Sequence, residues 1–432
     1  VEAAANALLT NIDITGRLPV DLDKKLIRGS QILVYRDDSI LEKIDVSYSL
    51  SVIDSAIEAK IFPGAQVFIS QHGETIVSKG FGYHTYHKSK EVSTETIFDL
   101  ASITKVVSAT PIVMKLVDDE ELTLDQPIND FFPDFYKSGK DTITIRHLLI
   151  HESGLSAYHR YFLESKYKGR GDILDNIINR RLTYKPGSEY KYSDLGMILL
   201  GTILERIGGN NLHALGKSWF FSPLGMNNTF YNPPANQWKN IPPTERTVIP
   251  IGTSNDSFRR KIANISTKLF GPMKSLSYDL FPRKTAHGYV HDENANLLGG
   301  ISAHAGLFSN AEDLGKYGQM LLNDGMVGDK KIIDKDLLSL FTTRQSTVDE
   351  ANRGYGWDRP DRDGASSAGD YFSDKAFGHL GYTGTSFWID PEQELVVVLL
   401  TNRVYPTRNN PGIKQVRRKF HNSLIKSILR LN

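Results

Sequence analysis

The sequence predicts an α+β fold in which an antiparallel sheet, flanked by helices from both ends of the chain, lies beside a mostly helical lobe. Three observations predict it: hairpin patterns near both ends, amphipathic helices outside those hairpins, and helical patterns through the middle. We expect a sheet lobe at about 46–100 and 286–432 and a helical lobe at about 101–285, with the functional site between them.

The N-terminal part of the sheet is predicted from two adjoining patterns. Apolar residues recur at helical spacing over Leu50–Ile61, and Pro63 with Gly64 is expected to end that helix. Ala65–Ser70 and Thr75–Lys79 then have the composition of two strands joined by a short turn. The chain therefore enters the sheet as a helix followed by a hairpin.

The C-terminal part repeats these elements in reverse order. Thr385–Ile389 and the aliphatic run Leu395–Leu400 flank a polar turn, which predicts a second hairpin with a buried return strand. Residues 413–431 form an amphipathic pattern typical of a terminal helix. Residues 232–285, rich in Pro and polar residues, are expected to form a long irregular excursion.

Composition excludes several function classes. Lys and Arg total 51 against 50 Asp and Glu, so no polyanion such as nucleic acid is expected as a partner. The chain has no cysteine, which excludes disulfides and thiolate chemistry. No apolar run approaches the roughly 20 residues of a membrane span. The sequence begins at Val1 without a signal peptide, and we expect it to be a mature or excised fragment.

The first chemical motif is Ser102-Ile103-Thr104-Lys105 at the start of a predicted helix. Residues three apart on a helix share a face, so the Ser102 hydroxyl and the Lys105 amine can meet. A serine needs a base to become a good nucleophile, and a lysine can be that base if its pKa falls. An exposed helix with an unrelated Ser and Lys is the alternative for this motif taken alone.

Two further motifs follow in the chain. Tyr192-Ser193-Asp194 can present a phenol to the nucleophile as a proton relay, although a buried structural tyrosine has the same pattern. The run Gly378–Gly384 (GHLGYTG) leads into a strand. Its glycines allow the backbone to approach a substrate, and an N–H after Gly381 can pair with that of Ser102 as an oxyanion hole. A glycine-rich strand entry without function is the alternative.

Together these motifs resemble the serine β-lactamase and penicillin-binding protein superfamily, in its class C β-lactamase, D-alanyl-D-alanine carboxypeptidase and esterase branch. The resemblance covers about residues 46–432. Further matching segments are Thr144–Leu155, Pro223–Met226, Val290–Ala295 and Gly299–Ser309.

The resemblance implies a fold of the β-lactamase/transpeptidase type and a covalent acyl-enzyme on Ser102, with Lys105 and Tyr192 moving its proton and no cofactor or metal. It also implies that the N–H groups of Ser102 and Tyr382 hold the oxyanion. Its motifs place Asp194, His379 and Gly381 at the substrate. The expected substrate is a peptidoglycan-derived peptide, an ester or a β-lactam, and the expected compartment is periplasmic or otherwise extracytoplasmic.

Two positions depart from the family pattern. Asp194 stands where the family usually has Asn, and its carboxylate is expected to stabilise protonated Lys105 and a neutral phenol at Tyr192. His379 stands where the family has a lysine that attracts a substrate carboxylate, and a histidine is mostly neutral near pH 7. The histidine at 379 weakens the case for a potent β-lactamase and leaves room for esters or peptides.

The segment 1–45 is expected to be a separate N-terminal extension. Ala7–Val20 resembles the end of a family 3 glycoside hydrolase of the β-N-acetylglucosaminidase kind, which some bacterial proteins fuse to a β-lactamase-like domain. An ordinary extension packed on the sheet is the alternative. A glycosidase partner would make peptidoglycan peptides plausible substrates for Ser102.

Two other functions remain open at this point. The pairs His147/His151 and His287/His291 have a spacing that can bind zinc, but neither contains the Glu of His-Glu-x-x-His. A non-catalytic peptidoglycan-binding module that kept the fold and lost turnover is the main alternative to an enzyme. Labelling of Ser102 by a serine-reactive probe separates these two.

Overall fold

The computed structural model describes residues 15–17, 31–33, 44–134, 140–248, 283–349, 351–361 and 366–430. The chain separates into two compact units, Val1–Asp45 and Val46–Asn432. In the first unit, strands β1 (Thr15–Arg17) and β2 (Gln31–Leu33) pair antiparallel. The rest of the predicted glycosidase-like segment, and most of the 232–285 excursion, lie outside the described residues.

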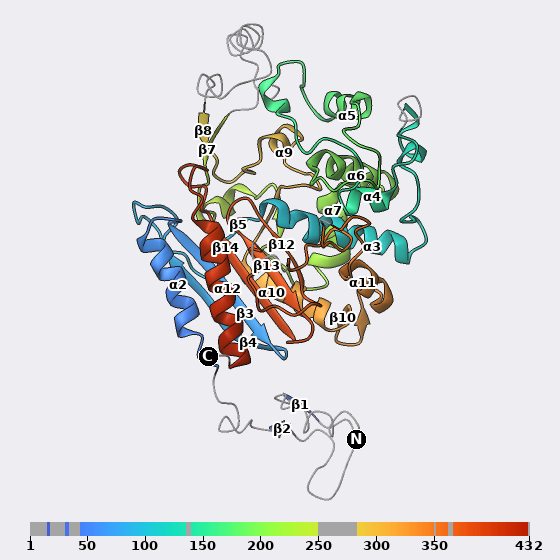
Figure 1. Cartoon of the computed structure of the whole chain (residues 1–432). Coiled ribbons are helices and arrows are strands. Elements are labelled where there is room, and N and C mark those ends of the chain that lie inside the picture. The colour runs from blue at the N-terminus through green and yellow to red at the C-terminus, as the bar shows by residue number, and fades with distance from the viewer. Residues whose placement is uncertain are drawn as a thin grey trace, which may run out of the picture. The chain divides into compact units, whose positions relative to one another are not determined.

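The second unit is built on a five-stranded antiparallel sheet of order β12-β13-β14-β3-β4. The N-terminal hairpin supplies β3 (Gly64–Gln71) and β4 (Glu74–Gly82), and the C-terminal part supplies β12 (Phe377–Leu380), β13 (Ser386–Asp390) and β14 (Leu395–Thr401). The central strands β3 and β14 pair directly and are buried along their whole length (Figure 1). Both predicted hairpins and the α+β class are confirmed.

Helices cover both faces of this sheet. α2 (Ser47–Glu58) and α12 (Ile413–Leu429), from the two ends of the unit, pack side by side (Figure 1). α10 (Ala311–Leu322) packs against β3, β13 and β14. It approaches closely because Gly315 faces the Phe68 ring, which a Cβ would meet at 2.4 Å. The first helix ends earlier than predicted, at Glu58, because Lys60 adopts a positive φ of 54°.

The helical lobe contains the other helices. In chain order its α-helices are α3 (Thr110–Asp118), α4 (Ile145–Leu149), α5 (Arg170–Asn179), α6 (Asp194–Ile207), α7 (Leu212–Gly216) and α9 (Glu293–Leu297), and α11 (Lys335–Thr342) packs on α3. Shorter 3₁₀ or π turns are η1 (Ala101–Ile103), η2 (Lys105–Ala109), η3 (Ile128–Asp130), η5 (Tyr161–Leu163), η6 (Lys217–Phe221) and η7 (Ala235–Asn240). Apolar residues of α3 and α6 fill the centre of the main core. Among the described residues, no helix combines the length and the apolar character that crossing a membrane requires.

A small second sheet joins the two lobes. It has the order β5-β9-β6 and consists of β5 (Phe98–Asp99), β9 (Leu307–Ser309) and β6 (Phe230–Tyr231). Two further pairs are β7 (Arg246–Val248) with β8 (Arg283–Thr285), and β10 (Met326–Val327) with β11 (Lys330–Lys331). β5 ends three residues before Ser102, so this sheet fixes the segment that carries the predicted nucleophile.

Candidate active site

Ser102 lies in a turn that its neighbours hold firmly. Asp99 is buried, and its carboxylate accepts hydrogen bonds from the backbone N–H groups of Ala101 (2.8 Å) and His291 (2.7 Å). Ala101 has a φ of 48°, which a residue with a Cβ rarely adopts. The chain thus turns sharply from β5 into η1, and Ser102 sits on that turn at the edge of a cavity.

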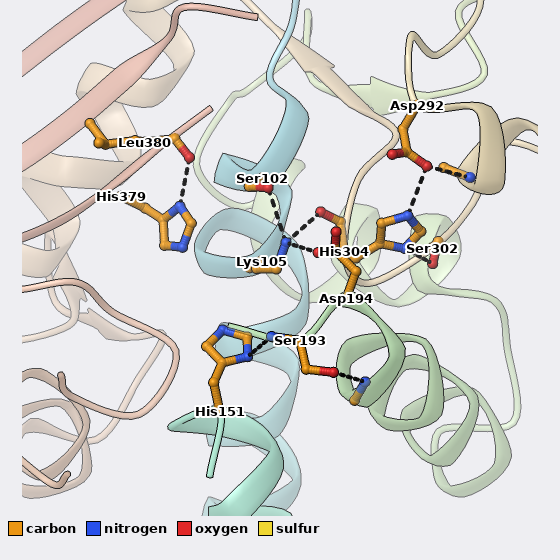
Figure 2. Close-up of polar contacts among 12 residues, drawn as sticks. Ser102, Lys105, His151, Ser193, Asp194, Asp292, Ser302, His304, His379 and Leu380 are labelled. Carbon is orange, nitrogen blue, oxygen red and sulfur yellow. Dashed lines mark hydrogen bonds and ion pairs between the residues drawn. The ribbon is translucent and has the colours of Figure 1, made fainter. Parts of the chain in front are cut away.

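Lys105 is fully buried behind Ser102, and its three N–H bonds all have acceptors (Figure 2). Its Nζ donates to Ser102 Oγ at 3.0 Å, to Asp194 Oδ1 at 2.9 Å and to the carbonyl of His304 at 2.9 Å. Burial alone would lower the pKa of Lys105, but the Asp194 carboxylate and the Tyr192 phenol outweigh it and raise that pKa above its ordinary value. The resting amine is therefore a charged ammonium.

Asp194 reaches Lys105 because it is the first residue of α6. Ser193 caps that helix, and its Oγ accepts from the Gly196 N–H at 3.1 Å. A carboxylate in the first helical turn is favoured by the helix dipole. Tyr192 is the residue just before the cap. It lies over Lys105, whose Nζ is 4.8 Å from the phenol ring centroid. Burial raises the pKa of Tyr192, and the nearby Lys105 charge lowers it only in part.

The cavity in front of Ser102 has a volume of about 660 Å³. Ser102, Tyr192, Asp194 and Tyr382 of the predicted set line it together. Its remaining charged lining consists of three carboxylates and two guanidinium groups: Glu245, Asp292, Glu293, Arg160 and Arg408. The wall is thus more polar than a pocket for an apolar ligand, and it suits a substrate that carries hydrogen-bonding groups.

The carboxylates of the cavity wall are fixed by cations and histidines. Arg408 binds Glu245 and also Glu293, to which its Nη2 donates at 2.7 Å. Burial alone would raise the pKa of Asp292, but His304 Nε2, 2.9 Å away, lowers it to about 2. The same His304 supplies the carbonyl that Lys105 binds. Asp292 is therefore linked to the predicted base through a single residue.

The turn after β12 is bound to the segment just before Ser102. Thr383 Oγ1 donates to the Asp99 carbonyl at 2.7 Å, and Thr385 Oγ1 donates to the Leu100 carbonyl at 3.1 Å. Only glycine fits at position 381, because a Cβ there would be 2.4 Å from the Leu100 carbonyl oxygen. These contacts hold the turn that carries Tyr382 against the segment before Ser102, and both residues line the cavity.

His379 does not line the cavity. Its side chain is 2% exposed, and its Nδ1 lies 2.8 Å from the Leu380 carbonyl, so Nδ1 carries the proton and donates (Figure 2). Burial lowers the pKa of His379 to about 4. Its ring centroid is 6.0 Å from that of Tyr192. His379 is thus a neutral neighbour of the phenol, and Gly381 is also absent from the cavity lining among the described residues.

The histidine pairs considered for zinc have other contacts. His147 belongs to the capping box of α4, and its Nδ1 accepts from the Thr144 N–H at 3.1 Å. His151 packs its ring 4.4 Å from that of Tyr192. His287 Nε2 is 3.0 Å from the Trp238 carbonyl, and His291 Nε2 is 3.0 Å from Glu245. In the part of the chain that the structure describes, no three His, Cys, Asp or Glu side chains are grouped as metal ligands.

Sequence reasoning missed three parts of this site. The His304 carbonyl lies in a segment that the resemblance already included, but a backbone acceptor leaves no residue-type signal. Arg408 and Arg353 come from segments without a motif, and only the fold brings them to the cavity wall and to Tyr192. A buried arginine is rare enough to be a signal, but burial at these positions was not readable from periodicity.

Comparison with known proteins gives consistent results. The family model described as Beta-lactamase matches residues 51–421. The chain is 31% identical to an N-acetylmuramyl-L-alanine amidase of Bacillus subtilis (strain 168), with 84% of each chain covered. It is 30% identical to a putative D-alanyl-D-alanine carboxypeptidase of Escherichia coli (strain K12), over 81% of this chain and 80% of that one. Among solved structures, EstCE1, a hydrolase with promiscuous acyltransferase activity, aligns with a TM-score of 0.65 at 22% identity and covers 88% of this chain and 98% of its own.

Proposed function

The chain belongs to the beta-lactamase family of serine hydrolases, and from that membership we propose that Ser102 attacks an amide or ester carbonyl and forms an acyl-enzyme. The observation that carries the proposal is the 3.0 Å contact between Lys105 Nζ and Ser102 Oγ at the edge of a cavity large enough for a peptide end. A nucleophile and a candidate base within hydrogen-bond distance are what covalent catalysis needs.

The proposed reaction has two steps. The Lys105–Tyr192 pair first releases one proton to solvent; Ser102 Oγ then bonds to the carbonyl carbon while its own proton passes to that pair, and the N–H groups of Ser102 and Tyr382 stabilise the oxyanion. The pair then gives that proton to the departing amine or alkoxide as the carbon–leaving-group bond breaks. Water attacks the Ser102 ester in the second step, and the proton it loses returns to Ser102 as the acid product leaves.

We propose that the substrate is a cell-wall peptide, cleaved by a class C-like D-alanyl-D-alanine peptidase or a related peptide hydrolase. Relatives at 30% identity or more carry the names of a putative D-alanyl-D-alanine carboxypeptidase and of an N-acetylmuramyl-L-alanine amidase, which supports peptide over other amides. The polar lining of the cavity is consistent with such a substrate. The second candidate is a carboxylesterase or weak β-lactamase, and the neutral, buried His379 favours it over a potent β-lactamase.

The experiment that tests this proposal is labelling with a fluorophosphonate serine probe, followed by a turnover panel. We expect the wild type to be labelled, Ser102→Ala to be unlabelled, and the matched control Ser51→Ala on α2 to be labelled like the wild type. Nitrocefin, p-nitrophenyl esters and purified muropeptides then identify the substrate, with Ser102→Ala as the blank. Absence of labelling and turnover in the wild type would instead favour a binding module.

We expect Asp194→Asn to move the rising limb of the pH profile for acylation to lower pH. The Asp194 carboxylate is the largest influence that raises the pKa of Lys105 against burial. Asparagine keeps a hydrogen-bond acceptor for Lys105 but removes the charge, so the amine loses its proton at lower pH. The rate of probe labelling between pH 5 and 10 measures this. Asp54→Asn, at an exposed position of α2, is the control, and a limb that stays in place in Asp194→Asn contradicts the prediction.

We also propose that the unit Val1–Asp45 derives from the end of a glycoside hydrolase domain, on the resemblance of Ala7–Val20. A longer native chain would then carry a glycosidase in front of this hydrolase, outside the cytoplasm. Sequencing the native gene upstream of the Val1 codon tests this directly.

A further inference from the structure

We propose that Arg353 is a positioning residue for Tyr192, because its guanidinium group supplies a permanent positive charge beside the phenol where His379 supplies none. The proposal rests on the proposed function, in which Tyr192 takes part in moving the Ser102 proton. Arg353 belongs to no motif of the sequence, and it reaches the site from the segment that follows α11.

Arg353 is buried and close to the phenol. Its side chain is 5% exposed, and its Cζ lies 5.7 Å from the ring centroid of Tyr192 and 5.8 Å from that of Tyr190. Its Nη1 contacts the Tyr190 hydroxyl at 3.4 Å, and its Nη2 donates to the Gly356 carbonyl at 3.4 Å. An arginine cannot lose its proton in a protein, so this charge is present at every working pH.

A carboxylate holds the guanidinium group in place. Arg353 Nη1 forms an ion pair with Asp358, and the backbones of the two residues also pair as a β-bridge. The charge of Arg353 counteracts burial and lowers the pKa of Asp358, so this carboxyl is ionised. Asp358 Oδ2 is also 4.0 Å from His379 Nε2, so the ion pair borders the histidine that neighbours the phenol.

The groups around Tyr192 come from five elements. Lys105 of η2 and Asp194 of α6 face it from the cavity side, and the neutral rings of His151 and His379 flank it at centroid distances of 4.4 and 6.0 Å. Burial lowers the pKa of both histidines, so neither is charged near pH 7. Among the described residues near the phenol, Lys105 and Arg353 are therefore the cations.

These two cations have different roles. Lys105 gives up or accepts the proton that the reaction moves, so its charge changes during the cycle. The charge of Arg353 does not change. It therefore favours the phenolate form of Tyr192 in every state and, because like charges repel, also favours the neutral form of Lys105. Both effects make the Lys105–Tyr192 pair a better proton acceptor for Ser102.

The test compares variants that remove opposite charges from the same ion pair. We expect Arg353→Met to lower kcat by on the order of 10- to 100-fold with little change in KM, and to move the rising limb of the pH profile to higher pH. We expect Asp358→Asn, which keeps an acceptor for Arg353, to move the same limb to lower pH. Arg353→Lys keeps the charge and is expected to leave the limb near its wild-type position.

A readout without turnover separates this proposal from the proposed function. In protein labelled with ¹³Cζ-tyrosine, the Tyr192 signal is assigned by its loss in Tyr192→Phe, and its ionisation is followed by NMR. We expect Tyr192 to ionise at higher pH in Arg353→Met and at lower pH in Asp358→Asn. Should Arg353→Met fail to fold, Asp358→Asn alone decides. An ionisation that stays in place, or that moves in the same direction in both variants, overturns the role of Arg353, whereas an unlabelled Ser102 with opposite shifts overturns only the proposed function.

Discussion

Replacing Lys105 with methionine is expected to slow acylation of Ser102 by on the order of 10³-fold or more, with little change in substrate affinity. Methionine fills a similar volume but cannot accept a proton. Lys105 Nζ does not line the cavity, so a bound substrate loses no direct contact. The measurement is the second-order rate constant for probe labelling, together with KM for the substrate that the turnover panel identifies.

Lys105→Arg tests the role of Lys105 as a base more sharply than Lys105→Met does. Arginine keeps a positive charge for Asp194 but does not deprotonate, so we expect it to be as slow as Lys105→Met. Lys115→Met, further along the same helical segment and paired with Asp119 at the surface, is the matched control and should react like the wild type. The double variant Ser102→Ala/Lys105→Met should lose no more activity than Ser102→Ala alone, because the two residues act as a unit. Rapid labelling of Lys105→Arg would show that the amine is not the base.

Acidification is expected to destabilise the fold strongly between about pH 6.5 and pH 4. His379 and His421 are 2% and 0% exposed, and burial lowers the pKa of each to about 4. In the unfolded chain each binds a proton below about pH 6.5, whereas in the folded chain each does so only below about pH 4. The unfolded state therefore binds more protons in this window, and stability falls with pH by roughly 3 kcal/mol for each histidine.

Thermal melting from pH 8 to pH 4 measures this effect. The wild-type Tm should be level above pH 7 and fall steeply below it. His421 contacts two serines, with Nε2 3.3 Å from Ser386 Oγ and Nδ1 2.9 Å from the Ser367 carbonyl. His421→Gln removes one of the two titrating histidines, so the slope of stability against pH should fall by about one proton. His72→Gln, at an exposed position beside Glu394, is the control and should melt like the wild type. A Tm that is level down to pH 4.5 contradicts the prediction.

The sequence predicted the long, regular elements of the fold because their patterns are local. The aliphatic run of β14 reflects burial of that strand, and the spacing of apolar residues in α12 reflects burial of one helix face. Both patterns can be recognised in the sequence alone. The strands β5, β6 and β9 have two or three residues each, too few to show any period. The small sheet that carries the Ser102 turn was therefore not predictable.

The same distinction applies to the candidate site: residues in local motifs were predicted, and the placement of the others depends on packing. Ser102, Lys105, Tyr192 and Asp194 were predicted as a group, and the structure brings all four together. The position of His379 depends on how deeply β12 is buried, which is a property of packing. Arg353 and Arg408 lie more than 150 residues after Tyr192 in the sequence. Spacing rules relate neighbours on one helix or strand, so they could not predict that these arginines reach the site.

The pairing of β3 with β14 has a consequence for how the protein is made. Ile69 faces Val397 across more than 300 residues of sequence, so a ribosome working at about 5–20 residues per second completes β14 tens of seconds after β3 has emerged. Throughout that delay the apolar edge of the nascent hairpin has no native neighbour, and contacts between such distant segments form slowly. Synthesis of this chain should therefore depend on a holding chaperone, and yields should rise when the nascent hairpin is shielded from other copies.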